Sequence, residues 1–119
     1  MSVMMSVQSA DPQNLNVHQL SAALRSRRLS SGELVNTLLD RIATHDQKLH
    51  AFVALYPDEA RLAAEAADTA IRAGHAVGPL HGIPIALKDL VEIEGRVTTA
   101  VQKFGKIGSR PRLRHWCGK

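Results

Sequence analysis

The sequence contains few of the residues that stabilise small domains covalently. Its 119 residues include one cysteine, which excludes an internal disulfide framework and a zinc site built on paired cysteines. Aromatic residues make up 3% of the chain, so a core has to be built from Ala, Leu, Val and Ile. No apolar run reaches the ~18 residues of a membrane-spanning helix, and the start has no signal-peptide pattern. These absences predict a cytoplasmic protein without a membrane partner.

The six histidines do not form a metal-binding pattern. They are scattered along the chain, with no pair at i and i+4 and no acidic partner at the spacing of a metal site. His115 and Cys117 lie two residues apart in a segment without periodicity, and such a pair alone is weak evidence for a metal site. We therefore expect neither a metal nor another cofactor.

Positive charge is concentrated near the end of the sequence. Residues 1–100 carry nine basic and eleven acidic side chains, whereas residues 101–119 carry six basic side chains and no acidic one. The net charge of +4 therefore describes a mildly acidic segment followed by a basic one. Trp116 lies in the basic segment, where cations and an indole together have the chemistry to hold phosphates and stack a base. We keep nucleic-acid binding as an alternative and do not favour it, because charge alone gives unspecific, salt-sensitive affinity.

Three segments have the periodicity and the boundaries of helices. The first is short, with apolar residues at Val17, Leu20 and Leu24. Ser30 and Glu33 then have the spacing of a capping box. The helix behind them is expected to bury a stripe formed by Leu34, Val35, Leu38, Leu39 and Ile42. A third helix starts at Pro57, ends at a capping Gly74, and has an alanine-lined face at Ala60, Ala63, Ala64, Ala67 and Ile71.

Three short apolar runs are typical of strands. Residues 51–55 suit a buried strand, residues 83–87 are expected to be buried on both faces of a sheet, and residues 90–94 partly alternate. Pro84 counts against a central position in a sheet, because proline cannot donate a backbone hydrogen bond. The order helix, helix, strand, helix, strand predicts an α/β fold. Two or three strands are too few for a sheet covered on both faces, so the sequence indicates part of a larger domain.

Lys88, at the end of the run over residues 83–87, is the candidate catalytic residue. A strand would point Lys88 and Asp89 to opposite faces, so the two charges need not neutralise each other. An amine held in an apolar wall has a lowered pKa, because its charged form is disfavoured there, and it then serves as a general base. The alternative is a solvated lysine at a strand end, and spacing alone favours this alternative.

The segment GPLHGIPIALKD, from Gly78 to Asp89, is followed by Gly95 and by Thr98-Thr99-Ala100. Together with upstream segments, it resembles the N-terminal signature of the amidase signature family over residues 17–100. The resemblance implies an α/β/α fold around a large mixed sheet. It also implies hydrolysis or transfer at carboxamide C–N bonds of small amide substrates by a Ser–cis-Ser–Lys triad.

Within that resemblance, Lys88 matches the catalytic lysine. A neutral lysine in this family takes a proton from a bridging serine, which in turn activates a nucleophilic serine. Backbone N–H groups of a glycine-rich loop stabilise the oxyanion that forms. The resemblance does not separate a general amidase or a specialised amidohydrolase from the amidase-type component of a tRNA-dependent amidotransferase.

The sequence departs from the family after Ala100. Family members continue with Gly-Ser and carry both triad serines further downstream, whereas this chain continues Val101-Gln102-Lys103. Ser109 follows a glycine but lacks the Gly-Ser-Ser-Gly context, so it is not assigned as a nucleophile. The change resembles translation in a shifted reading frame. We therefore expect a truncated amidase fragment that is inactive by itself.

Three segments follow from this interpretation. Residues 1–16 are expected to be a flexible leader, residues 17–100 a partial amidase domain, and residues 101–119 a basic irregular tail. A small helical interaction module built on residues 17–74 is a further alternative, in which the helices present a groove to a partner. Cooperative unfolding of the chain would favour that alternative over a fragment.

Overall fold

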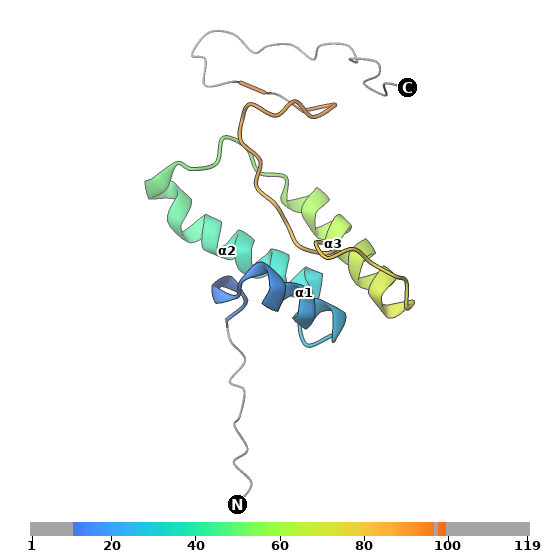
Figure 1. Cartoon of the computed structure of the whole chain (residues 1–119). Coiled ribbons are helices and arrows are strands. Elements are labelled where there is room, and N and C mark those ends of the chain that lie inside the picture. Colours follow the sequence, from blue (N-terminus) through green and yellow to red (C-terminus); the bar gives the residue numbers. More distant parts are fainter. Residues whose placement is uncertain (1–10, 97, 100–119) are drawn as a thin grey trace, which may run out of the picture. The chain divides into compact units, whose positions relative to one another are not determined.

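The computed structural model of the protein describes residues 11–96, 98 and 99 (Figure 1). Over these residues it contains the short 3-10 helix η1 (Pro12–Asn14) and three α-helices, α1 (Val17–Arg25), α2 (Ser31–Leu49) and α3 (Pro57–Arg72). The chain divides into two compact units, with the boundary between Pro84 and Ile85. All four helical elements belong to the first unit.

The start of α2 confirms the capping box expected from the sequence. The Glu33 N–H donates to Ser30 Oγ at 3.0 Å, and the Ser30 N–H donates to Glu33 Oε2 at 2.9 Å. Helix α1 begins with a second box, in which Asn16 and Gln19 exchange the same pair of hydrogen bonds. Each box gives partners to backbone donors that a helix start otherwise leaves unpaired.

The end of α3 confirms the expected role of Gly74. This residue has φ +75°, which places it in the left-handed region that terminates many helices. The Gly74 N–H donates to the Ile71 carbonyl at 3.0 Å, and the His75 N–H donates to the Ala70 carbonyl at 3.1 Å. This pair of bonds is a Schellman motif, and it turns the last helical carbonyls toward protein donors.

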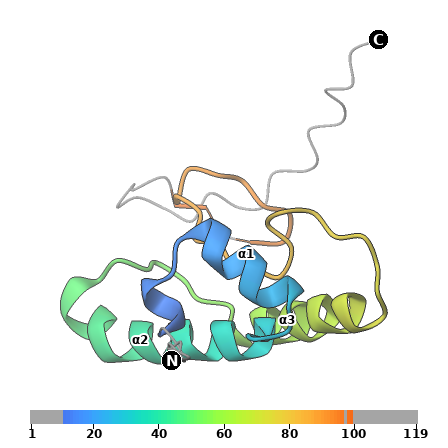
Figure 2. The same cartoon turned by 60° about the horizontal axis from the view of Figure 1, so that its bottom comes forward.

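The core of the first unit lies between the helices. Helices α2 and α3 pack against each other, and η1 contacts α2 (Figure 2). The predicted stripe of α2 is buried at Leu34 and Val35 and half-buried further along, whereas α3 buries Ala64 and Ala67 of its alanine face. Helix α1 adds Ala23 and Leu24. Small side chains on α3 permit the close approach of its backbone to α2.

The strand expected over residues 51–55 does not form. This stretch connects α2 to α3 without regular structure, and only Phe52 in it is half-buried. The Asp46 carboxylate, in the last turn of α2, accepts hydrogen bonds from the Ala51 N–H at 2.7 Å and the Phe52 N–H at 3.2 Å. A nearby side chain therefore takes the backbone donors that a neighbouring strand would have taken.

The strands expected over residues 83–87 and 90–94 are also not formed. The Ile83 N–H donates to the Leu80 carbonyl, and the Val91 N–H donates to the Lys88 carbonyl, both as local turns. Ile85 is 74% exposed, which contradicts burial on both faces. A strand is stable only beside a second strand, and the described part of the chain contains none. The described fold is therefore helical, and the expected α/β sheet is not seen in it.

Candidate functional site

The first half of the GPLHGIPIALKD segment is attached to α2 through Ser31 and to α3 through His81. Ser31 is 1% exposed, and its hydroxyl donates to the Gly82 carbonyl at 2.6 Å. A buried hydroxyl costs free energy unless it is hydrogen-bonded, so this short contact stabilises the position of Gly82 on the helix pair. In both views of the fold, the chain after α3 turns back along the helices (Figures 1 and 2).

Asp68 of α3 holds the first turn of α2 beside this contact. Its carboxylate accepts from the Ser31 N–H at 2.7 Å and from the Gly32 N–H at 3.0 Å. With the Ser30–Glu33 box, the N–H groups of the cap and of the first three helical residues of α2 therefore all have partners. A negative charge at a helix N-terminus is also favoured by the helix dipole.

Gly82 lies close to Ser31 of α2 and Ala67 of α3. Its φ of +78° favours glycine, and a Cβ at this position would lie 3.3 Å from Ser31 Cβ and 3.6 Å from Ala67 Cβ. The neighbouring His81 ring places Nε2 at 3.1 Å from the Ala67 carbonyl. Because a carbonyl only accepts, Nε2 carries the proton in this contact. Two adjacent residues of the motif thus bond to two different helices.

Lys88 and Asp89 lie in the second unit. Lys88 is exposed, and its carbonyl accepts from the Val91 N–H at 3.0 Å. The Asp89 carboxylate is half-buried and accepts hydrogen bonds from the Thr99 N–H at 3.0 Å and from the Thr99 hydroxyl. The Thr98 hydroxyl donates to the Val91 carbonyl at 3.2 Å. The threonines of the motif therefore close a loop directly after Lys88, and the described residues do not enclose the Lys88 side chain.

Sequence reasoning missed the residues that organise these contacts. Ser31 and Asp68 are separated by more than thirty residues, and neither has a spacing that marks it as a partner of the other. The pairing of Asp89 with Thr99 was also missed, although both residues belong to the motif. The feature of the sequence that links Asp89 to Thr99 is their shared membership of the motif.

Several sequence predictions concern residues outside the described part. These include the basic segment, Ser109, His115, Trp116 and Cys117, which lie within residues 100–119, and residues 1–10 of the expected leader. Among residues that are described, no helix is both long enough and apolar enough to cross a membrane. Within the same residues, no three His, Cys, Asp or Glu side chains gather in a way that could hold a metal ion.

Comparison with known protein families gives a match over the region that contains these motifs. A family model described as Amidase matches residues 33–106, which is more than half of the chain. The matched range includes Asp68, His81, Gly82, Lys88, Asp89 and Thr99. No solved structure matches the chain.

Curated relatives match over most of this chain. A glutamyl-tRNA(Gln) amidotransferase subunit from Trichlorobacter lovleyi is 45% identical over 88 residues, covering 74% of this chain and 18% of the relative. The corresponding Azoarcus protein is 48% identical over 91 residues, covering 76% and 18%. A Pseudomonas putida protein named amidase is 40% identical over 86 residues, covering 72% and 18%. The chain thus spans less than a fifth of the length of these relatives.

Proposed function

The chain belongs to the amidase family, and we propose that it supplies the N-terminal part of an enzyme that cleaves the C–N bond of small carboxamides. The observation that carries this proposal is the family match over residues 33–106, which include the GPLHGIPIALKD segment and its Lys88. Lys88 is proposed as the lysine of a Ser–cis-Ser–Lys triad, with both serines supplied by sequence beyond these motifs. The same chemistry serves hydrolysis, where water accepts the acyl group, and transfer, where an amine accepts it.

In this mechanism Lys88 accepts a proton and later returns one. Its neutral amine takes the proton of a bridging serine, and that serine takes the proton of the nucleophilic serine as it attacks the amide carbon. The ammonium so formed returns a proton to the leaving amine. An amine acts as a base at neutral pH when removal from water, or a nearby positive charge, disfavours its ammonium form. Because Lys88 is exposed in this chain, this role requires further protein to cover it.

The contacts around Lys88 suit a positioning role for its neighbours. Asp89 is hydrogen-bonded to Thr99 directly after Lys88, within the second unit. This contact restrains the backbone on the C-terminal side of the lysine. We include Asp89 and Thr99 in the proposal as residues that orient the Lys88 backbone, and not as groups that touch substrate.

A chimera tests whether this segment supplies the catalytic lysine. Residues 17–100 replace the aligned segment of the Pseudomonas putida amidase, and the product is assayed on an amide that the parent amidase hydrolyses. We expect activity in the chimera and a loss of at least about 10²-fold with Lys88→Ala, which is the scale of a missing general base. Lys88→Arg should be equally inactive, because a guanidinium keeps its proton at neutral pH.

Lys48→Ala is the matched control. Lys48 is also an exposed lysine, in the last turn of α2, and its removal should leave the activity of the chimera unchanged. Each variant is compared with the chimera by thermal unfolding, so that misfolding is recognised separately. A correctly folded Lys88→Ala chimera with full activity would rule out the proposed role.

A further inference from the structure

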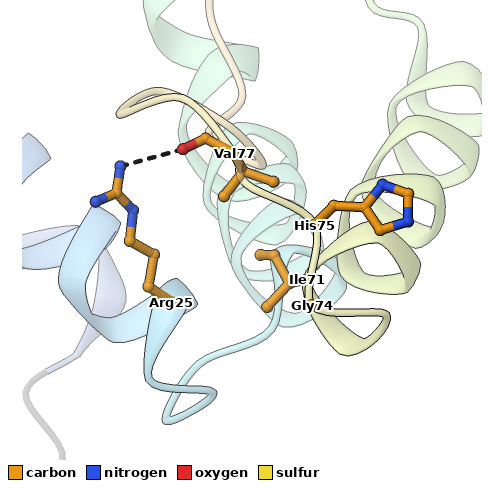
Figure 3. A pocket seen from close by; sticks show the side chains of 5 residues that line it. All are labelled: Arg25, Ile71, Gly74, His75 and Val77. Atoms are coloured by element: carbon orange, nitrogen blue, oxygen red, sulfur yellow. Dashed lines mark hydrogen bonds between the residues drawn. The ribbon is translucent and has the colours of Figure 1, made fainter.

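A pocket of about 320 Å³ lies where the end of α1 meets the chain that follows α3 (Figure 3). It is lined by Arg25, Ile71, Gly74, His75 and Val77, all in the first unit. Figure 3 shows the Arg25 guanidinium reaching toward Val77, while the His75 ring points away from Arg25. The pocket therefore combines one cationic side chain with the aliphatic side chains of Ile71 and Val77.

The Arg25 guanidinium has unused hydrogen-bonding capacity. Among the described residues, its one hydrogen bond runs from Nη2 to the Val77 carbonyl at 3.5 Å, which is longer than the usual N–H···O distance. A guanidinium has five N–H donors, and four remain for another acceptor. Arg27 and Arg28 follow two and three residues later, and none of the three arginines pairs with a carboxylate in the described part of the chain. Arg25 is thus a cationic group in the pocket lining that has no carboxylate partner among the described residues.

Three carbonyls at the helix end beside the pocket accept hydrogen bonds from protein N–H groups. The C-terminal carbonyls of a helix repel anions, so the hydrogen bonding of these carbonyls matters for the binding of an anionic ligand. Here the carbonyls of Thr69, Ala70 and Ile71 accept from Ala73, His75 and Gly74 at 2.9, 3.1 and 3.0 Å. Each of these three carbonyls thus has a protein donor, and Gly74 leaves open space because no atom lies within 4 Å of the place where a Cβ would stand.

We propose that this pocket binds small organic carboxylates. The planar guanidinium of Arg25 matches the two oxygens of a carboxylate, a geometry that lysine cannot reproduce. Ile71 and Val77 are half-buried and offer aliphatic surface to the body of the ligand. The combination favours a carboxylate that carries an apolar group over a bare inorganic anion. This site involves neither Lys88 nor the residues around it.

Titration of the 119-residue chain with sodium benzoate tests the proposal. Backbone amide resonances of Gly74, His75 and Val77 are followed by NMR at constant ionic strength. We expect saturable shifts with a Kd on the order of 1 mM, as for a small ligand at an open site. Benzamide has the same shape without the charge and should bind at least about tenfold more weakly, because it loses the charge-assisted hydrogen bonds.

Variants separate the charge from the apolar contact. Arg25→Gln keeps an N–H donor for the Val77 carbonyl and should weaken benzoate binding at least about tenfold. Arg41→Gln is the matched control, since Arg41 is also exposed and donates to a neutral oxygen, that of Gln13, at 2.7 Å. It should leave benzoate binding unchanged. Val77→Ser should weaken benzoate but not inorganic phosphate, which serves as the probe for charge alone.

Three outcomes would overturn the proposal. The first is the absence of saturable shifts at these amides in the wild-type chain. The second is equal affinity for benzoate and benzamide, which would show an apolar pocket without anion selectivity. The third is equal benzoate affinity in wild type and in an Arg25→Gln chain whose spectrum is otherwise unchanged. Because no readout involves amide hydrolysis, these outcomes are independent of the role proposed for Lys88.

Discussion

Asp68 shows how one side chain joins two helices. It belongs to α3 by sequence, yet its carboxylate accepts the first two N–H groups of α2. Ser30 and Glu33 provide the remaining caps from within α2 itself. The start of α2 is therefore stabilised by hydrogen bonds within its own first turn and by hydrogen bonds to Asp68 of α3. The bonds to Asp68 form only when α3 is packed on α2.

Replacement of Asp68 is expected to destabilise the chain. Asp68→Ala leaves the N–H groups of Ser31 and Gly32 without an acceptor in a partly buried place, and should lower the free energy of unfolding by about 2 kcal/mol. Asp68→Asn keeps one acceptor oxygen and should cost less. Glu65→Ala, an exposed acidic residue on the same helix, should change stability by no more than about 0.5 kcal/mol. Urea unfolding followed by circular dichroism measures all three, and equal effects of Asp68→Ala and Glu65→Ala would contradict the capping role.

Residue-level contacts were predictable only where they are local. The Ser30–Glu33 box follows from a spacing of three residues and a helical pattern behind it, so the sequence is sufficient to recognise it. The bond between Asp68 and Ser31 depends on how α3 packs on α2, which no local pattern encodes. Lys88 was identified as a candidate through the motif, since its spacing alone favoured a solvated lysine at a strand end, and it is exposed in the structure.

At the scale of elements, helices were predictable and strands were not. A helix forms its backbone hydrogen bonds within one segment, so periodicity, caps and Gly74 together identified α1, α2 and α3. A strand takes its hydrogen bonds from a different segment, which the described residues do not supply. Residues 51–55 instead use the Asp46 carboxylate as acceptor, and residues 83–87 lead from a local turn into exposed backbone.

Alanine substitutions at three glycines distinguish the cost of a left-handed backbone from the cost of a close steric contact. Gly74→Ala places a side chain at φ +75° in open space, so it should cost about 1 kcal/mol for the left-handed conformation alone. Gly82→Ala adds a Cβ at 3.3 Å from Ser31 Cβ to similar strain, so its cost should be larger. Gly78→Ala has neither a left-handed φ nor an atom within 4 Å and should be close to neutral. Thermal unfolding of the three variants should rank Gly82, Gly74 and Gly78 in decreasing order of effect, and any other order would contradict this account.

For the whole molecule, the core is small relative to the apolar surface left exposed. The buried apolar residues in the described part are Ala23, Leu24, Leu34, Val35, Ala64 and Ala67, half of them alanines. Ile85, Leu87 and Leu90 are all more than half exposed in the second unit. Small cores give little stability, and exposed apolar runs favour association. The chain spans 18% of the length of its Trichlorobacter lovleyi relative, in which further sequence is available to cover such surface.

The 119-residue chain by itself is expected not to hydrolyse amides. Its serines lack the glycine- and serine-rich context of the family nucleophile, and Lys88 is exposed to solvent. Release of the aryl amine from an aryl amide should remain at the rate of buffer. The active Pseudomonas putida amidase under identical conditions is the positive control. Hydrolysis that is abolished by Lys88→Ala would show that these residues suffice, and the proposed division of the triad would be wrong.

The bond from Asp68 to the start of α2 has a consequence for the order in which the fold assembles. The Ser31 and Gly32 amide protons find their acceptor 36 or 37 residues later in the chain. During synthesis, all residues of α2 are therefore made before Asp68, so this acceptor cannot yet protect the first turn of α2 from exchange with water. Slow hydrogen exchange at these two amides would report docking of α3 rather than formation of α2, since α2 can propagate from its own Ser30 cap. The exchange protection of these two amide protons thus reports the packing of α3 on α2.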